Sequence, residues 1–419
     1  MRRESIDVLV VGAGAAGLMA SVHAGRAAGP DARIVAVDGA RKVGMKILVA
    51  GGGRCNVTHH EVLPEDYAGS SRNAIRKVLR AYPVEAVVDF FAAEGVRLKR
   101  EETGKLFPTT DRARTVLDAL LNAVSSAGVE LRHPIRIESI ERRDDGFHVT
   151  GPGFAANAGR VVLCTGGKAL PKSGSDGMGL EIVRSLGHSV TEAVHPALVP
   201  LILAEADPIR ELGGIATPVR LSVRGESGRN IAEYTAPMLC THFGISGPVV
   251  LDASRHLLSA RAAGDQAEAF VRWLPEEDRE GFERTMIGAP SGMTCQSMLK
   301  GRLPDRLLRA LLHVSGVEPT DRVRGLTRER RRALLDVLFD HPLVVVGDRG
   351  YTFAEATAGG VPLSEIRLDS MESRVVPGLH LAGEICDVDG RVGGFNFQWA
   401  WASGWVAGRA VAATVGATA

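Results

Sequence analysis

Hydrophobic positions in the first part of the chain alternate between short buried runs and longer helical patterns. Ile6 to Val11 is a β-branched run that ends at a glycine, Leu18 to Ala28 is alanine-rich, and Ile34 to Val37 is a second apolar run. These patterns predict a strand, a helix and a second strand. Asn73 to Glu94 and Thr115 to Ala127 have apolar residues at helical spacing. Strands that alternate with helices predict an α/β domain with a doubly wound parallel sheet.

The pattern changes further along the chain. Four more apolar runs predict strands before residue 165: Val129 to Arg132, Ile135 to Arg142, Phe147 to Thr150 and Arg160 to Cys164. After Pro196 the runs are shorter and alternate with polar residues, at Leu198 to Ala204, Val219 to Val223, Ile231 to Thr235 and Ala267 to Trp273. These predict an inserted β-barrel-like domain. Charged segments with helical spacing, Leu307 to Val314 and Arg328 to Leu338, predict a helical subdomain.

The residue pattern of the first domain occurs again near the C-terminus. An apolar run at Gly378 to Ala382 predicts a buried strand, and an alanine-rich segment predicts a helix from about Phe395. We therefore expect one Rossmann-like domain interrupted by an insertion. The predicted parts are 1–192 for the first part of the nucleotide-binding domain, 193–275 for the inserted β domain, 276–340 for the helical subdomain, 341–353 for the return of the insertion, and 354–419 for the second part.

Composition narrows the class of protein. The formal charge of +1 argues against a general electrostatic grip on nucleic acid or on an anionic membrane. No run of eighteen uninterrupted apolar residues predicts a membrane span. The five cysteines are scattered and form no C-x-x-C pair, which is typical of a reduced cytoplasmic protein. We expect a small-molecule substrate, no nucleic acid and no membrane, and the sequence leaves the oligomeric state open.

A glycine-rich turn follows the first predicted strand. Gly12, Gly14 and Gly17 form G-x-G-x-x-G, with Ala15 and Ala16 between the last two glycines. The first glycine permits a tight turn, the second allows a pyrophosphate to approach the backbone, and the third lets the helix pack on the sheet. Asp38 ends the second strand, where an acid hydrogen-bonds a ribose hydroxyl. This combination predicts an adenine dinucleotide site.

A second segment suggests which dinucleotide binds. Lys46 precedes a run of six residues: Gly51, Gly52, Gly53, Arg54, Cys55 and Asn56. Three successive glycines expose backbone N–H groups and could lie against a flat ring system, while Lys46 or Arg54 neutralises phosphate. For Cys55 we favour packing or flavin contact over redox chemistry, because no second cysteine is near it in sequence.

The C-terminal segment supplies the remaining candidates. Gly383, Glu384 and Asp387 follow a strand, and their acids suit ribityl or ribose hydroxyls. A turn then starts the last helix at Gly393, Gly394, Phe395 and Asn396. The positive end of that helix would stabilise the N1 and C2 carbonyl edge of an isoalloxazine, where negative charge collects on reduction.

With these residues in place, the chain resembles the BaiN/YhiN-like family of FAD-binding oxidoreductases. This family belongs to the two-dinucleotide-binding-domain flavoproteins, which include aminoacetone oxidase-like members. The resemblance covers nearly the whole length and rests on VVGAGAAGLMA, GMKILVAGGGRCNVT, GKLFP, VVLCTGG, THFGISGP, TAGGV, MESRVVPGLHLAGEICDVDG and GGFNFQWAWASG. It implies FAD as the cofactor and adds Thr165, Gly166 and Gly167 beside the flavin and Ile137 near the adenine. Many relatives carry Glu where Asp38 stands. Members catalyse unlike reactions, so the resemblance names no substrate.

The expected reaction is hydride transfer between flavin N5 and a small organic substrate bound where the inserted domain faces the isoalloxazine. NAD(P)H is a candidate donor that would dock transiently, because the sequence has no second G-x-G-x-x-G, and oxygen is a candidate acceptor. No catalytic acid is assigned, although Lys105, His195, His242 and Tyr351 are candidates, and no histidine cluster predicts a metal site.

Three alternatives remain. The first is a flavin-binding redox partner without a dedicated substrate. The second is a nicotinamide dehydrogenase, which leaves the second and third glycine segments unexplained. The third is a nucleic-acid enzyme, suggested by a basic run at Arg328, Arg330, Arg331 and Arg332, although Glu329 and Asp336 make a solvated helix face the better interpretation.

Overall fold

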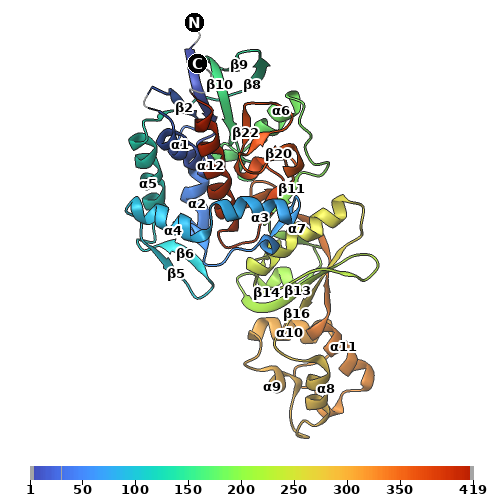
Figure 1. The fold of residues 1–419 in the computed structure, drawn as a ribbon. Coiled ribbons are helices and arrows are strands. Elements are labelled where there is room, and N and C mark those ends of the chain that lie inside the picture. Colours follow the sequence, from blue (N-terminus) through green and yellow to red (C-terminus); the bar gives the residue numbers. More distant parts are fainter. Residues whose placement is uncertain (1–3, 30, 416–419) are drawn as a thin grey trace. The chain divides into compact units, whose positions relative to one another are not determined.

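The structure is a computed structural model that describes residues 4–29 and 31–415. Two compact units divide the chain. Unit 1 comprises Met1–His195 and Glu355–Ala419, and unit 2 comprises Pro196–Ala354. Figure 1 shows that both ends of the chain contribute to unit 1. The predicted finer division of the insertion into three segments stays a prediction.

Unit 1 is built on a nine-stranded sheet. Its parallel strands stand in the order β22-β10-β1-β2-β7, namely Leu379–Leu381, Phe154–Leu163, Glu4–Val11, Ile34–Val37 and Glu130–Arg132. The remaining strands join antiparallel: β20 (Ile366–Arg367), β21 (Glu372–Ser373), β8 (Ser139–Arg143) and β9 (Gly146–Gly151). Strand order reverses between β1 and β10, the point at which doubly wound sheets bind ligands. The predicted fold class is confirmed.

Unit 1 also contains helices, of which the first, the fifth and the last contact strands of this sheet. The helices are α1 (Ala15–Ala27), α2 (Met45–Gly53), α3 (Arg72–Ala81), α4 (Val84–Ala93), α5 (Ala113–Ser126), α6 (Met178–Ser185) and α12 (Phe395–Ala413). Short strands fill the connections: β3 (Thr58–His59), β4 (Tyr67–Gly69), β5 (Leu98–Arg100), β6 (Lys105–Pro108), β19 (Ala356–Ala358) and β23 (Val388–Gly390). Strand β2 is buried along its whole length, as expected of a parallel strand covered on both faces.

Two predicted elements of unit 1 were wrong in extent. Asn73 to Glu94 forms two helices, α3 and α4, because Pro83 lacks an N–H and pushes the preceding residue into an extended conformation. The predicted strand from Ile135 is confined to β8. The N–H of Ile135 donates instead to the carbonyl of Asp38 (2.7 Å), so this part of the segment borders the end of β2.

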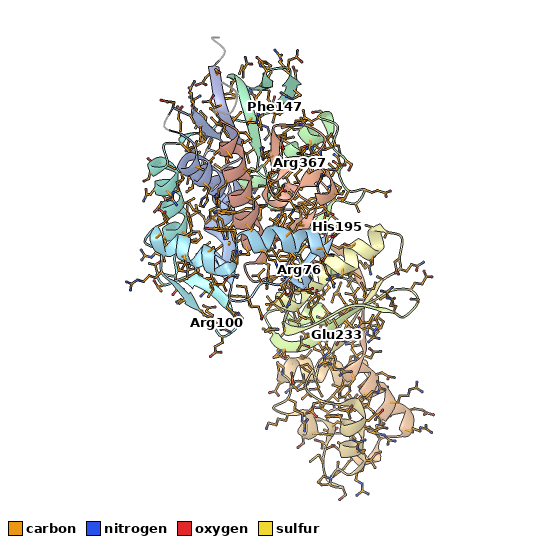
Figure 2. The ribbon with its side chains drawn as sticks, in the orientation of Figure 1. Arg76, Arg100, Phe147, His195, Glu233 and Arg367 are labelled. Atoms are coloured by element: carbon orange, nitrogen blue, oxygen red, sulfur yellow. The ribbon has the colours of Figure 1, made fainter. Side chains whose placement is uncertain are left out.

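Unit 2 is an antiparallel sheet with helices. The strand order is β17-β16-β13-β14-β15-β12-β18, namely His341–Leu343, Glu268–Arg272, Ala216–Arg224, Asn230–Thr241, Gly244–Ser246, Leu201–Leu203 and Val345–Asp348. Strand β14 exposes Glu233, which is labelled in Figure 2. Only Val344 separates β17 from β18, although they stand at opposite ends of the order. Within the described residues no ladder joins them, and a closed barrel stays a prediction.

Five helices complete unit 2: α7 (Pro248–Ala262), α8 (Arg279–Ile287), α9 (Cys295–Leu299), α10 (Asp305–Val314) and α11 (Arg328–Phe339). Helix α7 was not predicted from the hydrophobic pattern, although Pro248 at its first position is a helix-start signal. Leu221 of the sheet and Leu311 of α10 belong to the same buried cluster. The strands and the helices of the insertion therefore share one hydrophobic core.

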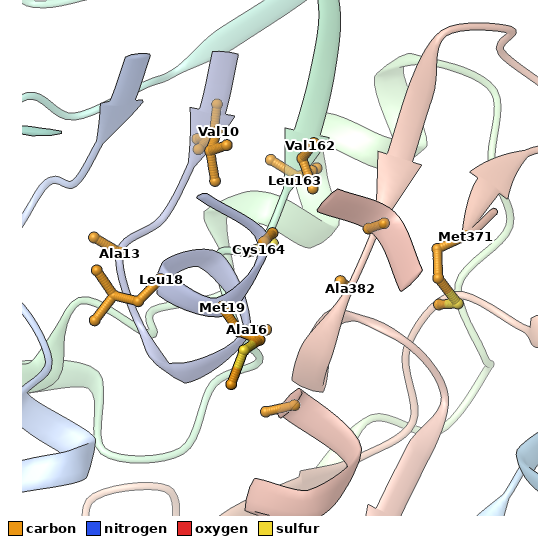
Figure 3. Packing of buried hydrophobic residues seen from close by; sticks show 14 of the residues in the cluster. Val10, Ala13, Ala16, Leu18, Met19, Val162, Leu163, Cys164, Met371 and Ala382 are labelled. Carbon is orange, nitrogen blue, oxygen red and sulfur yellow. The ribbon is translucent and has the colours of Figure 1, made fainter. Parts of the chain in front are cut away.

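Helices α1 and α12 make the closest packing in unit 1. A Cβ on Gly404 would lie 2.4 Å from the carbonyl oxygen of Ala16, and one on Gly408 would lie 2.3 Å from that of Ala20. Figure 1 shows the two helices side by side, and Figure 3 shows Ala16 in the core near Cys164. These glycines let the backbone of the last helix rest on that of the first.

We predict that Gly408→Ala lowers the free energy of unfolding by about 1–3 kcal/mol, because the new methyl group overpacks this contact. Ala413→Val adds bulk at an exposed position of the same helix and is the matched control, with a change within about 0.5 kcal/mol. Denaturant unfolding of both variants and the wild type measures the difference. Equal stabilities would show that the two helices can move apart without loss.

Candidate functional site

The three glycines of the first turn have different surroundings. A Cβ on Gly12, whose φ is +99°, would lie 2.5 Å from the carbonyl oxygen of Cys164. A Cβ on Gly17 would lie 1.8 Å from the carbonyl oxygen of Gly12. A Cβ on Gly14 would meet nothing within 4 Å. Gly12 and Gly17 are therefore required by the protein's own packing, whereas the open space at Gly14 fits a ligand that approaches the backbone.

Asp38 organises the same turn. Its Oδ2 accepts the N–H of Ala13 at 2.6 Å, and its Oδ1 accepts the N–H of Ala40 at 2.7 Å. The carboxylate thus ties the end of β2 to the turn before α1. Each oxygen can accept a further hydrogen bond, as the predicted ribose contact requires.

Lys46 and Glu384, from opposite ends of the chain, form an ion pair. The Lys46 ammonium lies 2.7 Å from Glu384 Oε2 and 3.1 Å from the hydroxyl of Ser175. Both side chains are largely buried, with 25% and 20% of their surface exposed. The predicted phosphate-neutralising lysine is therefore already paired with a predicted ribityl-binding acid.

The glycine run lies at the end of α2. Ala50, Gly51 and Gly52 leave the helical conformation, and Gly51 and Gly52 have positive φ angles of 57° and 69°. Gly51, Gly52 and Gly53 are exposed, and a Cβ on Gly52 would meet no atom within 4 Å. The backbone of this turn is therefore accessible, as the predicted contact with a flavin ring requires.

Arg54 and Cys55, which follow the run, serve the protein's own structure. The Arg54 guanidinium pairs with Glu101 at 2.6 Å and stacks 4.0 Å from the ring centroid of Phe107. Cys55 is completely buried, and burial raises the pKa of its thiol to about 12. Both cations suggested for phosphate thus have an acid partner, Lys46 in Glu384 and Arg54 in Glu101.

The C-terminal segments lie against the first two. A Cβ on Gly383 would lie 2.7 Å from the Cβ of Ala16 in the first turn of α1. A Cβ on Gly394 would lie 2.6 Å from the carbonyl carbon of Thr58, just after Asn56. Two hydrogen bonds with α12 reinforce the second contact. The Thr58 hydroxyl donates to the side-chain oxygen of Gln398 (2.7 Å), and the Trp401 indole donates to the carbonyl of Val57 (2.8 Å). Segments more than 300 residues apart in sequence thus meet.

The remaining C-terminal candidates have protein partners. Asn396 exchanges two hydrogen bonds with the backbone of Gly390, which fixes the turn before α12. The ring of Phe395 stacks on His59, with centroids 5.0 Å apart. Burial raises the pKa of Asp387, whose carboxylate accepts the Ser70 hydroxyl at 3.1 Å. These residues shape the start of α12, and their contact with a cofactor stays a prediction.

The two resemblance-based additions lie at strand ends in unit 1. Thr165, Gly166 and Gly167 directly follow β10, beside the turn after β1, and Gly166 has a φ of +74°. Ile137 is buried between β7 and β8. Gly167 packs against Thr357, whose hydroxyl oxygen accepts the N–H groups of Lys168 and Ala169 at 2.8 and 3.0 Å.

Three of the predicted residues carry buried polar atoms that have no hydrogen-bond partner. These atoms are Asn56 Oδ1, Thr165 Oγ1 and Glu384 Oε1. A buried acceptor or hydroxyl without a partner costs free energy that a bound ligand can recover. Because the three residues come from three separate segments that meet in unit 1, the site fits a cofactor rich in hydroxyl and amide groups, such as FAD.

Sequence reasoning missed two residues of this neighbourhood. Ser175 accepts from Lys46, and no motif marked it. Thr357 begins the quoted TAGGV motif, which was the signal that could have assigned it. Among the proton-donor candidates, Lys105 lies on β6, whereas His242 and Tyr351 lie in unit 2, where burial raises the pKa of Tyr351. His195 lies on β11 (His195–Ala197), and no catalytic acid is assigned.

A cavity of 690 Å³ lies elsewhere in unit 1, between the 60–65 segment and helices α3 and α4. Arg76, labelled in Figure 2, contributes to its wall. No predicted cofactor residue lines it, so we do not assign the dinucleotide to it. Across residues 4–29 and 31–415, no helix is long and apolar enough to cross a bilayer, and no three His, Cys, Asp or Glu side chains group as metal ligands.

The fold and the site together define a dinucleotide-binding protein of the Rossmann type. The profile of the HI0933-like protein Rossmann domain matches residues 6–410. The chain therefore belongs to the HI0933-like family, the BaiN/YhiN-like flavoproteins that its motifs resemble, and is an FAD-dependent oxidoreductase.

Two curated relatives align along almost the whole chain. The 3-dehydro-bile acid delta(4,6)-reductase of Clostridium scindens is 34% identical and aligns over 96% of this chain and 98% of its own length. The ribosomal RNA dihydrouridine synthase of Escherichia coli is 31% identical, with 96% and 97% covered. A solved flavocytochrome c3 fumarate reductase is more distant, at 19% identity with a TM-score of 0.49, covering 98% of this chain and 78% of that one.

We predict that Gly14→Ala folds normally but raises the dissociation constant for FAD about tenfold, which corresponds to ~1.4 kcal/mol. The new methyl group meets no protein atom, so only a bound pyrophosphate would feel it. Fluorescence titration of the apoprotein with FAD, together with a thermal melt of the apoprotein, checks this. Unchanged FAD affinity would contradict a pyrophosphate at this turn.

We also predict that the native protein resists thiol reagents at pH 8. All five cysteines are buried, and burial raises the pKa values of Cys55 and Cys164 to about 12. The thiolate fraction of such a group at pH 8 is about one part in ten thousand. Ellman's reagent should titrate five thiols in guanidinium and far fewer than one in buffer within minutes. Rapid native labelling at Cys55 would reopen its redox role.

Proposed function

We propose that this chain is a reductase that saturates a carbon–carbon double bond conjugated to a carbonyl group, with NAD(P)H as the donor. One observation supports binding of the FAD cofactor. The glycine turn before α1 and the segments that contain Lys46, Glu384 and Gly394 lie in contact in unit 1. The direction is supported by the names of the two relatives, a reductase of a delta(4,6) bile acid and a synthase of dihydrouridine. Dihydrouridine is uridine whose ring double bond, conjugated to a carbonyl, has been reduced.

The proposed reaction balances as a two-electron reduction. A hydride adds to the β-carbon of the substrate, the electron pair of the double bond moves toward the carbonyl, and a proton adds at the α-carbon. NAD(P)H is oxidised to NAD(P)⁺. FAD, when bound, would supply the relay of the hydride between the two substrates.

The chain's own groups would hold and tune that cofactor. The turn at Gly14 and the first turn of α1 would bind the pyrophosphate, and Asp38 the ribose. Lys46 would remain partly neutralised by Glu384, which keeps an oxygen available for a ribityl hydroxyl. The first turn of α12, starting at Phe395, would stabilise negative charge on the isoalloxazine.

Two relatives are named as ribosomal RNA dihydrouridine synthases, so RNA that contains uridine should be tested as a substrate. The basic run that suggested nucleic acid is largely neutralised. Arg330 pairs with Asp321 at 2.5 Å, Arg331 with Glu283 at 3.1 Å. This pairing supports our expectation of a small-molecule substrate.

The test uses the FAD-loaded protein under nitrogen. NADPH or NADH should bleach the absorption near ~450 nm, and an α,β-unsaturated ketone such as a Δ4-3-ketosteroid should restore it. The saturated ketone is the matched control and should not restore it. A uridine-containing ribosomal RNA fragment forms a second arm, read by mass spectrometry for a gain of two hydrogens.

The arms separate the alternatives. Recovery with the ketosteroid alone supports a small-molecule reductase, and recovery with the RNA alone contradicts the small-molecule expectation while retaining the chemistry. A flavin that NAD(P)H bleaches but only oxygen or a redox protein restores would indicate the redox-partner alternative. A flavin that neither nicotinamide reduces would overturn the proposed donor.

A further inference from the structure

Unit 2 holds an arginine between two phenylalanine rings. The guanidinium carbon of Arg349 lies 4.3 Å from the ring centroid of Phe243 and 3.9 Å from that of Phe353. Both distances lie within the range of cation–π attraction. The N–H of Arg349 donates to the carbonyl of Pro200 at 3.1 Å, which anchors the backbone beside β12. The guanidinium is therefore held in one plane.

Some of the other arginines that stack on phenylalanine have a carboxylate partner, whereas Arg142 and Arg272 have no ion pair within the described residues. Arg224 donates to both oxygens of Asp340, at 3.1 and 2.5 Å, and Arg54 pairs with Glu101 at 2.6 Å. Arg349 differs from them. Within residues 4–29 and 31–415, no carboxylate lies within 4.0 Å of its guanidinium, and the guanidinium donates no hydrogen bond to the protein.

The nearest acid in sequence is engaged elsewhere. Asp348 directs Oδ1 to the N–H of Gly350 at 2.6 Å. On the other side, the exposed ring of His242 packs edge-on against Phe243, with centroids 5.2 Å apart. Arg210 Nε donates to the carbonyl of His242 at 3.0 Å, which adds a second cation to this end of unit 2.

A stacked guanidinium keeps its donors for a ligand. Two rings flank the guanidinium of Arg349, and its N–H groups form the fork that matches a carboxylate or a phosphate. Arg349 is partly exposed, and 49% of Phe353 is exposed, so a ligand can reach the fork along an apolar flank. The Arg349 guanidinium, which has no anionic partner within the described residues, can therefore bind an anionic ligand.

We propose that Arg349, Phe243 and Phe353 form a binding site for an oxyanion attached to a planar or apolar group. The oxyanion is the carboxylate of a small organic acid or the phosphate of a nucleotide, because both fit the same fork. This proposal concerns binding and does not rest on the reductase reaction.

The test observes Arg349 directly. The protein is labelled with ¹⁵N-arginine, and its Nε–H resonance is assigned by its loss in Arg349→Gln. Benzoate and uridine 5′-monophosphate are titrated in, with benzamide and uridine as the matched neutral probes. We expect one or both anions to shift this resonance with at least tenfold higher affinity than the neutral probe of the same shape. The anion that binds identifies the source of the oxyanion.

Variants separate the roles of charge and stacking. Arg349→Lys keeps the charge but loses the fork and should weaken the anion several-fold, and Phe353→Ala should weaken it similarly. Arg272→Gln removes a cation that stacks more loosely on Phe339 in the same unit and should change nothing. Calorimetry measures the affinity of every variant, because Arg349→Lys no longer has the Arg349 Nε–H resonance. Equal affinity for the charged and neutral probes, or wild-type binding by Arg349→Lys and Phe353→Ala, would overturn the proposal.

Discussion

The close approach of α12 to α1 is the contact on which the rest of unit 1 depends. The two helices come from opposite ends of the chain, and the whole of unit 2 is inserted between the segments that carry them. Gly404 and Gly408 permit the approach, because any side chain there would collide with the backbone of α1. When α12 docks, its first turn is placed over Thr58, and Gly383 is placed against Ala16. A domain interrupted in sequence thereby becomes continuous in space.

That closure also explains the electrostatics of the cofactor site. Lys46 and Glu384 are separated by 338 residues and neutralise each other only in the folded unit. An unpaired lysine in this partly buried position would attract phosphate more strongly but would be costly before the cofactor arrives. The pair leaves one glutamate oxygen without a partner, together with acceptor or hydroxyl groups on Asn56 and Thr165. The site is thus stable enough to fold and still has polar groups for a ligand to satisfy.

Unit 2 contains no G-x-G-x-x-G motif, in contrast to unit 1. Its strands and helices share one core, and some of its arginines, such as Arg279, Arg330 and Arg331, pair with acids. Arg349 instead lies close to two phenylalanine rings. Relatives that align over nearly the full length are named for a bile acid and for ribosomal RNA, which are very unlike compounds.

The sequence by itself determined the α/β class, the interrupted nucleotide-binding domain and the glycine turns, because these depend on local periodicity and on backbone conformations that few residues adopt. Local pattern did not predict the break at Pro83, the helix α7 or the short extent of β8. Only the tertiary structure decided that Arg54 serves Glu101 whereas Lys46 meets Glu384, and that Arg349 stands between two rings. The reason is physical: a charge's partner is set by distance in space, and residues hundreds of positions apart become neighbours only when the chain has folded.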